Sequence, residues 1–359
     1  AAATGVLTAT ATATATATRA QGAIASTTPN LFGKSVLITG CSSGFGRLGA
    51  EHYARLGAKV FATMRNLPRP EAEELRVLAA EKNLDITVIE IDVLSDELVA
   101  AGVAEAERLN GGGIDVLVNN AGIGVSGPIE VQDMEATELI FGTNVLGAHR
   151  MARAVLPGMR SKGSGLIVPI SSQLGRVIVP YSGHYSPTKF ALEAMSEAMA
   201  YELVPHGIEV SIIEPGGYPT EVWVNRNRYT GALKERAEEI HTSGYPQVVA
   251  SMGEEDGSGR SADPMDIPRA IAQIIAMRGS SRFQAADKNQ RGDGRDAGRM
   301  ARRVGLRPAD QCGAQCRLVH SDRGWARSRS AHWRPALPRS TQRPKRAADG
   351  WSTRLPPTG

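Results

Sequence analysis

Tyr185 and Lys189 are the residues of this sequence whose types and spacing most directly suggest chemistry. They stand four positions apart in YSPTK, where a long apolar-periodic segment begins. On a helix, positions i and i+4 lie on the same face, so the phenol and the ammonium would project side by side. Because a nearby cation favours the phenolate, we expect Lys189 to lower the pKa of Tyr185 from about 10 towards neutrality. A tyrosine of that kind can donate or accept a proton at physiological pH.

The chain around this motif alternates between short apolar runs and helical patterns. Strands are predicted at 35–40, 59–64, 86–93, 115–119, 165–171 and 207–214, and helices at about 47–56, 71–82, 96–109, 134–159, 185–204 and 263–277. This alternation is typical of the α/β class, and it predicts a three-layer Rossmann-type fold, a parallel sheet with helices on both faces. In such a fold ligands bind beyond the carboxyl ends of the strands, where the motifs of this chain stand.

A glycine-rich segment, TGCSSGFG (39–46), directly follows the first predicted strand and precedes the first helix. Glycines at 40, 44 and 46 let the backbone turn tightly and approach a pyrophosphate. The helix that follows offers unpaired N–H groups and the positive end of its dipole. Placed between a strand and a helix, the segment indicates a dinucleotide site.

Further motifs follow in order: NNAG (119–122), Asn144 in TNVLG, an ISS ending at Ser172, YSPTK (185–189) and EPGGYPT (214–220). With TGCSSGFG they make residues 35 to about 278 resemble the short-chain dehydrogenase/reductase family in its compact single-domain branch. TGCSSGFG followed by VFATMRN is especially similar to the 17β-hydroxysteroid and retinol dehydrogenases. The resemblance covers about two thirds of the chain.

Hydride transfer between a nicotinamide and a carbonyl leaves negative charge on oxygen, which must receive a proton. Tyr185 is the predicted acid/base, and Ser172 would donate a hydrogen bond to the same oxygen. The resemblance implies that Lys189 also holds the nicotinamide ribose and that Asn144 supports the lysine through a water. For Ser172 and Asn144 the alternatives are a strand-end cap and a polar helix contact.

We expect NADP as the cofactor. Proteins that prefer NAD place an acid near the end of the second strand, whereas Met64 stands there and Arg65 follows. A guanidinium suits the 2′-phosphate of NADP, and Ser43 could add a hydroxyl. The alternative is that Arg65 is a solvated surface charge. The expected cofactor-binding residues are Gly40, Ser42, Ser43, Gly44, Phe45, Gly46, Arg65, Asp92, Val93, Asn119, Ala121, Gly122, Tyr185, Lys189, Pro215, Gly216 and Thr220.

Two stretches depart from this regularity. Pro169 stands where relatives commonly carry asparagine, and proline is unusual inside a central strand. Residues 217–253 are the least regular part of the body and carry Trp223, Tyr229 and Tyr245. They suggest a mobile aromatic flap that favours a hydrophobic alcohol or ketone, although the aromatics could equally serve only to anchor the loop.

The charge of the chain is unevenly distributed. The net charge is +4 overall, but residues 282–359 carry 16 Arg, 2 Lys and 6 Asp, which leaves −8 for residues 1–281. An acidic body gives no reason to propose a nucleic-acid partner. The tail indicates a disordered segment, a shifted reading frame or a basic arm. Cys312, Cys316 and His320 lack a fourth ligand for zinc, so no metal is predicted.

The domain organisation follows from these patterns. Residues 1–33, with their Thr/Ala alternation, are expected to be disordered, either as a simple repeat or as a transit-like segment; 34–281 would form the catalytic domain, and 282–359 the tail. Three cysteines favour a reducing, cytoplasmic compartment, and no segment is apolar enough to span a membrane. The resemblance implies a homodimer or homotetramer formed by the helices at 134–159 and 185–204.

Two functions remain open at this point. The first is an NADP-dependent oxidoreductase acting on a hydrophobic alcohol or carbonyl compound. The second is a non-catalytic nucleotide-binding protein that acts through partner contacts of its basic tail. All four catalytic positions are filled, which favours the first.

Overall fold

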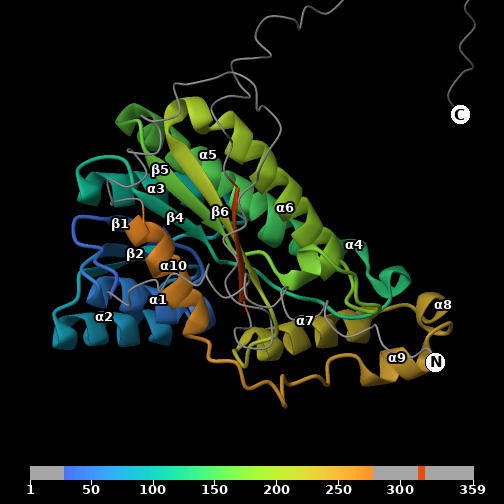
Figure 1. The fold of residues 1–359 in the computed structure, drawn as a ribbon. Coiled ribbons are helices and arrows are strands. Elements are labelled where there is room, and N and C mark those ends of the chain that lie inside the picture. Colours follow the sequence, from blue (N-terminus) through green and yellow to red (C-terminus); the bar gives the residue numbers. More distant parts are fainter. Residues whose placement is uncertain (1–27, 278–313, 320–359) are drawn as a thin grey trace, which may run out of the picture. The chain divides into compact units, whose positions relative to one another are not determined.

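A seven-stranded sheet forms the centre of the fold. The computed structural model describes residues 28–277 and 314–319 (Figure 1). The strands lie in the order β3-β2-β1-β4-β5-β6-β7, and the first six are parallel. Their bounds are β1 Ser35–Ile38, β2 Lys59–Met64, β3 Ile86–Glu90, β4 Val116–Asn119, β5 Gly165–Pro169, β6 Ile208–Pro215 and β7 Ala314–Val319.

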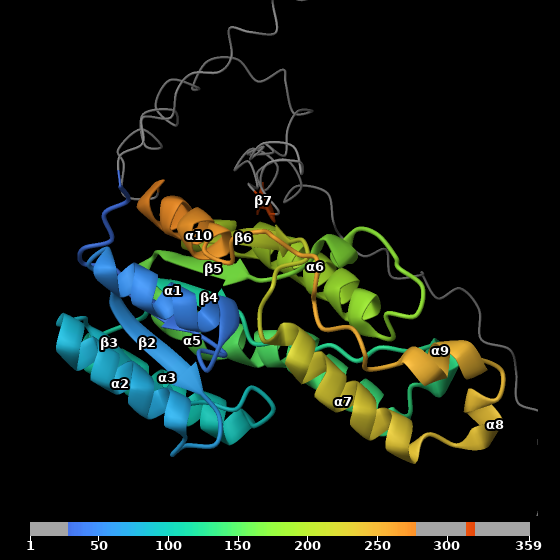
Figure 2. The same cartoon turned by 90° about the horizontal axis from the view of Figure 1, so that it is seen from below.

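Helices cover both faces of the sheet, which confirms the predicted α/β Rossmann-type architecture (Figure 2). Helices α1, α2 and α10 pack on one face, and α3, α5 and α6 pack on the other. The helices are α1 Gly44–Arg55, α2 Pro70–Lys82, α3 Asp96–Asn110, α4 Met134–Phe141, α5 Gly147–Lys162, α6 Tyr185–Glu202, α7 Val222–Arg236, α8 Glu239–Thr242, α9 Pro246–Ser251 and α10 Asp266–Met277. Of the described helices, none is both long and apolar enough to cross a bilayer.

The local sequence explains where several elements start and stop. Ser95 and Asp133 cap α3 and α4, because their side-chain oxygens accept hydrogen bonds from the N–H groups of Leu98 and Ala136. Pro169 is the last residue of β5, so its missing N–H does not interrupt the ladder. Beyond it the backbone pairs again, with Ile170 donating to Asn119 at 2.9 Å.

The long helix predicted at 134–159 is confirmed, since helical backbone runs without a gap through α4 and α5, with a π-helical turn at Gly142–Leu146 between them. Two other expectations about the elements were wrong. The segment expected to be least regular contains α7, a helix of 15 residues. The expected boundary at residue 34 is late, because Leu31 is fully buried in the core and its N–H bonds to the carbonyl of Leu56.

The tail also differs from its prediction over six residues. Ala314–Val319 forms β7 and pairs antiparallel with β6, and thus supplies the last strand that the sequence patterns did not show. The disorder predicted at the termini otherwise falls on residues outside those described. The candidate zinc side chains Cys312, Cys316 and His320 also lie outside the described set. Within that set no three metal-ligating side chains cluster.

Candidate active site

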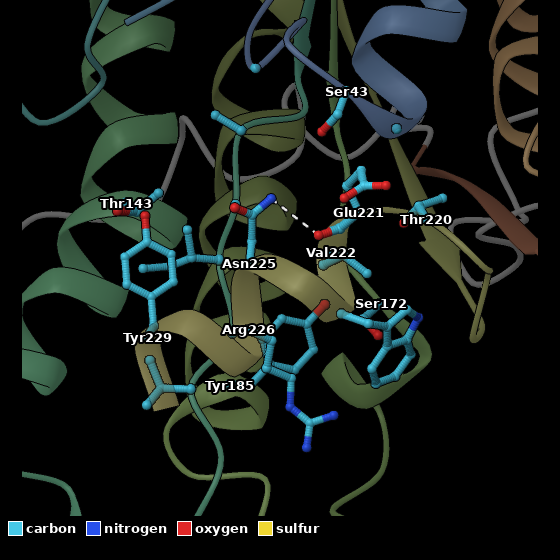
Figure 3. Close-up of a pocket in the computed structure, with 18 of the residues that line it drawn as sticks. Ser43, Thr143, Ser172, Tyr185, Thr220, Glu221, Val222, Asn225, Arg226 and Tyr229 are labelled. Atoms are coloured by element: carbon cyan, nitrogen blue, oxygen red, sulfur yellow. Dashed lines mark hydrogen bonds between the residues drawn. The ribbon is translucent and has the colours of Figure 1, made fainter. Parts of the chain in front are cut away.

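A cleft at the carboxyl ends of the parallel strands holds the candidate site. Its cavity has a volume of about 1470 Å³ and extends from the glycine-rich loop to the segment around α7 (Figure 3). Tyr185, Ser172 and Lys189 all line it. The predicted convergence of the motifs at the strand ends is therefore confirmed.

The glycine-rich loop makes a tight turn between β1 and α1. Gly40 and Gly44 have φ angles of +73° and +55°, which favour glycine. A Cβ on Gly46 would lie 2.3 Å from the carbonyl oxygen of Gly40, so only glycine lets the helix approach the strand so closely. Ser43, at the N-cap of α1, makes no side-chain capping hydrogen bond. The first N–H groups of the helix therefore lack a side-chain cap and can bind the phosphates of a dinucleotide.

Two residues that the sequence reasoning missed hold this loop to the end of β4. The Thr39 hydroxyl accepts hydrogen bonds from the N–H groups of Asn120 and Ala121 at 3.0 and 2.9 Å. The Asn120 amide donates in turn to the carbonyl of Thr39 at 2.8 Å. The sequence feature that could have indicated this contact is the pair of asparagines in NNAG, of which the second, Asn120, makes the hydrogen bond to Thr39.

Most of the expected cofactor residues lie on the cavity wall, but two do not. Those on the wall are Gly40, Ser42, Ser43, Gly44, Phe45, Arg65, Asp92, Val93, Ala121, Gly122, Tyr185, Lys189, Pro215, Gly216 and Thr220. Gly46 lies behind the wall and acts through the close approach described above. Asn119 is buried in β4, and its amide donates to the carbonyl of Ala148 at 3.2 Å. The side chain of Asn119 therefore points into the packing between β4 and α5, and a contact of its backbone with the cofactor stays a prediction.

The side chains predicted to be catalytic come from the end of β5 and the start of α6. Tyr185 is the first residue of α6, and its hydroxyl hydrogen-bonds with Ser172, which follows β5. The Ser172 hydroxyl also accepts from the N–H of Leu174 at 3.1 Å. One turn along α6, the buried Lys189 ammonium donates to the carbonyl of Ile170 at 2.9 Å and lies 5.5 Å from the centre of the Tyr185 ring.

The protonation states differ from the sequence-based expectation. Burial raises the pKa of Tyr185 above its ordinary value, and the Ser172 hydrogen bond and the charge of Arg226 oppose this only in part. Burial also lowers the pKa of Lys189 to about 8, against the opposing charge of Glu193. The expectation that Lys189 lowers the pKa of Tyr185 therefore does not hold in this structure. Loss of hydration outweighs the Ser172 hydrogen bond and the charge of Arg226, so Tyr185 holds its proton at neutral pH.

Asn144 lies behind the cavity wall, in the π-helical turn between α4 and α5. Its amide oxygen accepts from the N–H of Ile123 at 2.8 Å, and its amide nitrogen donates to the Ile123 carbonyl and to the Thr188 hydroxyl. A Cβ built on Gly122 would lie 3.4 Å from the Asn144 oxygen and 3.7 Å from the Lys189 nitrogen. Asn144 thus connects the loop after β4 to α6 near Lys189. This is the polar helix contact that the sequence analysis gave as the alternative role.

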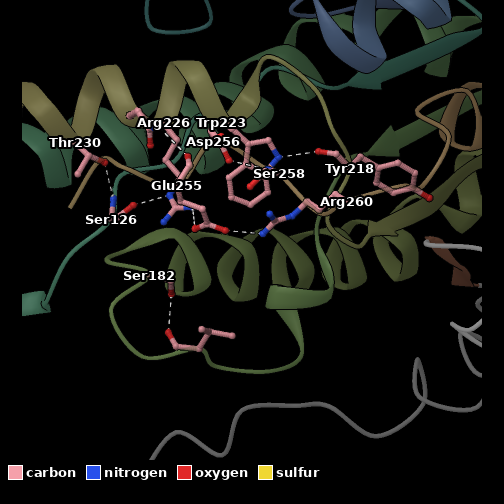
Figure 4. Close-up of polar contacts among 12 residues, drawn as sticks. Ser126, Ser182, Tyr218, Trp223, Arg226, Thr230, Glu255, Asp256, Ser258 and Arg260 are labelled. Atoms are coloured by element: carbon pink, nitrogen blue, oxygen red, sulfur yellow. Dashed lines mark hydrogen bonds and ion pairs between the residues drawn. The ribbon is translucent and has the colours of Figure 1, made fainter. Parts of the chain in front are cut away.

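The opposite wall of the cleft comes from α7 and the loop that follows α9. Arg226 donates to the Ser126 hydroxyl and pairs with Glu255. Glu255 also pairs with Arg260, whose guanidinium lies 3.8 Å from the Trp223 ring centre (Figure 4). Arg226 reaches the side of Tyr185, yet no motif singled it out. The sequence signals it only by two arginines in VNRNR, Arg226 and Arg228, which stand in the segment that was expected to cover the substrate.

Comparison with known proteins identifies the family. A family model described as short chain dehydrogenase matches residues 34–230. The chain belongs to this family. Membership of this family makes the chain an oxidoreductase. Tyr185, Lys189 and Ser172 lie together on its cavity wall, as the family motifs predicted.

Individual relatives of this short-chain dehydrogenase differ in what they are named for. It is 35% identical to human retinol dehydrogenase 8 over 256 residues, which covers 68% of this chain and 78% of the relative. It is 34% identical to 3-ketodihydrosphingosine reductase of Bacteroides thetaiotaomicron, over 68% of this chain and 84% of the relative. A solved 3-ketoacyl-(acyl-carrier-protein) reductase of Brucella melitensis, complexed with NADH, is 27% identical with a TM-score of 0.55, covering 68% of this chain and 92% of that one.

Proposed function

We propose that this short-chain dehydrogenase is an NADP-dependent enzyme that interconverts a hydrophobic alcohol and its aldehyde or ketone. The observation that carries the proposal is the meeting of the Tyr185 and Ser172 hydroxyls on the cavity wall, across the cleft from the glycine-rich turn. A dinucleotide fits this turn, since Gly46 permits the close approach and α1 begins without a side-chain cap.

Tyr185 is the acid and base of the proposed reaction. When bound, the nicotinamide supplies or accepts the hydride at the substrate carbon. In reduction the Tyr185 hydroxyl gives its proton to the carbonyl oxygen, which the Ser172 hydroxyl holds by a hydrogen bond. In oxidation the Tyr185 phenolate takes the proton back. Because burial raises the pKa of Tyr185, the residue carries the proton required for reduction at neutral pH.

The remaining catalytic residues position the tyrosine and the cofactor. Lys189, held by the carbonyl of Ile170, would hold the nicotinamide ribose beside Tyr185. Asn144 would keep this part of α6 in place through Thr188 and through the loop at Ile123. Arg65, beside the end of β2, would bind the 2′-phosphate that distinguishes NADP from NAD.

The substrate side of the cleft favours an apolar molecule. The wall includes Val179, Val222, Val248 and Met252, which offer contacts to hydrocarbon. Two relatives are named for retinol and for 3-ketodihydrosphingosine, which both carry long apolar chains. We therefore expect activity on carbonyl compounds or alcohols with an extended apolar part.

Tyr185→Phe tests the proposed chemistry separately from binding. Loss of the hydroxyl should leave NADPH affinity nearly unchanged and lower turnover about 10²–10⁴-fold, the usual contribution of general acid catalysis. NADPH oxidation with retinoid, steroid and long-chain carbonyl compounds is the assay. Tyr201→Phe, on the exposed part of the same helix, is the matched control and should keep full turnover. A Tyr185→Phe variant with most of its turnover would show that another group supplies the proton.

A further inference from the structure

The arginines that line the cleft fall into two groups. Arg69, Arg226 and Arg260 each pair with a carboxylate of Glu71 or Glu255. Within the described part of the chain, Arg65 and Arg228 have no carboxylate at ion-pair distance, although both line the cavity. Two guanidinium charges on a cavity wall without an acidic partner favour an anionic ligand.

Tyr229 connects these two arginines. The guanidinium of Arg65 donates a hydrogen bond to the Tyr229 hydroxyl at 2.8 Å, across 164 residues of sequence. The guanidinium of Arg228 lies 4.9 Å from the centre of the Tyr229 ring. Two cations and one hydroxyl therefore gather where the end of β2 faces α7. After accepting from Arg65, the phenol still has its own proton to donate, and the guanidinium of Arg65 still has further N–H groups.

We propose that Tyr229 and Arg228 complete, together with Arg65, a binding site for the 2′-phosphate of NADP. This inference rests on the proposed NADP-dependent function and extends it to α7. A phosphate monoester offers three acceptor oxygens and close to two negative charges at neutral pH. Arg65 can bind two of these oxygens, and the Tyr229 hydroxyl can donate to the third while it fixes the Arg65 fork. Arg228 supplies the second positive charge.

The site would also link the cofactor to the substrate wall. Arg226 stands three residues before Tyr229 on α7, so the two side chains lie on neighbouring positions of one helix face. Arg226 bonds to Ser126 and lies beside Tyr185, as described above. A phosphate that holds Tyr229 would therefore hold the segment of α7 that closes the substrate side. A cofactor without the phosphate would leave α7 without this contact.

Binding measurements without substrate test the inference. Titrations would compare NADPH with NADH, and 2′,5′-ADP with 5′-AMP, since each pair differs only in the phosphate. Tyr229→Phe keeps the ring but removes the hydroxyl, and should weaken NADPH and 2′,5′-ADP by about tenfold while leaving NADH and 5′-AMP unchanged. Arg228→Gln should act in the same direction, with a loss that shrinks as salt is added. Tyr245→Phe is the control, because its hydroxyl bonds to Glu130 and it should change none of the four affinities.

The outcomes separate this inference from the proposed function. If Arg65→Asp removes the preference for NADPH while Tyr229→Phe and Arg228→Gln retain it, the shared site is wrong and the NADP-dependent function stands. Equal weakening of NADPH and NADH by Tyr229→Phe would also overturn it, because the hydroxyl would then only shape the cleft. Equal affinity of the unmutated protein for NADPH and NADH would contradict the NADP proposal itself.

Discussion

Arg176 should contribute strongly to the stability of the fold, because it pairs with two buried carboxylates close to Ser172. It follows the turn Gln173–Gly175 after Ser172, and its guanidinium bonds to Glu193 of α6 and to Glu214 of β6. The carboxylate side chains are only 3% and 6% exposed, whereas the arginine is 39% exposed. Arg176→Met keeps the apolar stem and leaves both carboxylates without the guanidinium.

The expected loss follows from these exposures. Removing one partner of a buried ion pair costs about 3–5 kcal/mol, and the outward side of Arg176 is screened by water, which places this case at about 2–4 kcal/mol. For a domain of this size each kcal/mol shifts Tm by about 2–4 °C, so we expect Arg176→Met to lower Tm by about 5–15 °C. Turnover should fall as well, because the segment after Ser172 loses its connection to α6 and β6.

Thermal and urea unfolding measure this effect against a matched control. Arg108→Met removes an arginine whose pair with Glu105 lies on the surface, and such pairs contribute about 0–1 kcal/mol. The triple change Arg176→Met, Glu193→Gln and Glu214→Gln should recover part of the stability, since neither buried side chain then carries the negative charge that Arg176 faced. If Arg176→Met were as mild as Arg108→Met, the buried network would not stabilise the fold as argued.

Two further predictions concern the cofactor side. Burial lowers the pKa of Lys189 to about 8, so its charged form dominates at lower pH and is half lost at about pH 8. Because an anionic cofactor favours the charged form, NADPH affinity should be constant well below this pH and fall as the pH rises through about 8. Lys189→Met should flatten this profile in fluorescence titrations. Gly46→Ala places a methyl group 2.3 Å from the Gly40 carbonyl oxygen and should lower both Tm and cofactor affinity. Gly231→Ala in α7 meets no atom within 4 Å and should instead stabilise the protein slightly, by up to about 1 kcal/mol.

The parallel sheet and the meeting of Ser172, Tyr185 and Lys189 were predictable, because their signals are local. Apolar runs mark buried strands, and the parallel arrangement brings strand ends to one edge whatever the loops do. The π-helical turn at Gly142–Leu146 was not predictable in this way. The 3.6-residue period continues through it, and Asn144 is placed there by hydrogen bonds to Ile123 and Thr188, which are distant in sequence.

The pKa of Tyr185 also depends on residues that are distant in sequence, so its direction could not be predicted from the motif. The i, i+4 spacing correctly placed a lysine beside the tyrosine, and it suggested a lowered pKa. The sign depends instead on how much water the folded chain removes from the phenol, which is a property of neighbours far apart in sequence. Burial also lowers the pKa of Lys189, so it favours the neutral form of both side chains, whereas the sequence suggested a charged pair.

Helix α7 was not predicted from the sequence, although it supplies several residues of the cavity wall. Val222 and Val224 are exposed, Val222 on the cavity wall, while Thr230 and Leu233 are buried, so the apolar positions of this helix do not form the clear stripe that predicts a surface helix. Yet the segment reaches three places in the cleft: Thr220, just before the helix, lies at the glycine-rich turn, Arg226 at the catalytic tyrosine and Tyr229 at Arg65. A helix that places polar side chains along the cleft has no continuous apolar face that its sequence period could reveal. Its absence from the sequence-based description is therefore a consequence of its position over the active site.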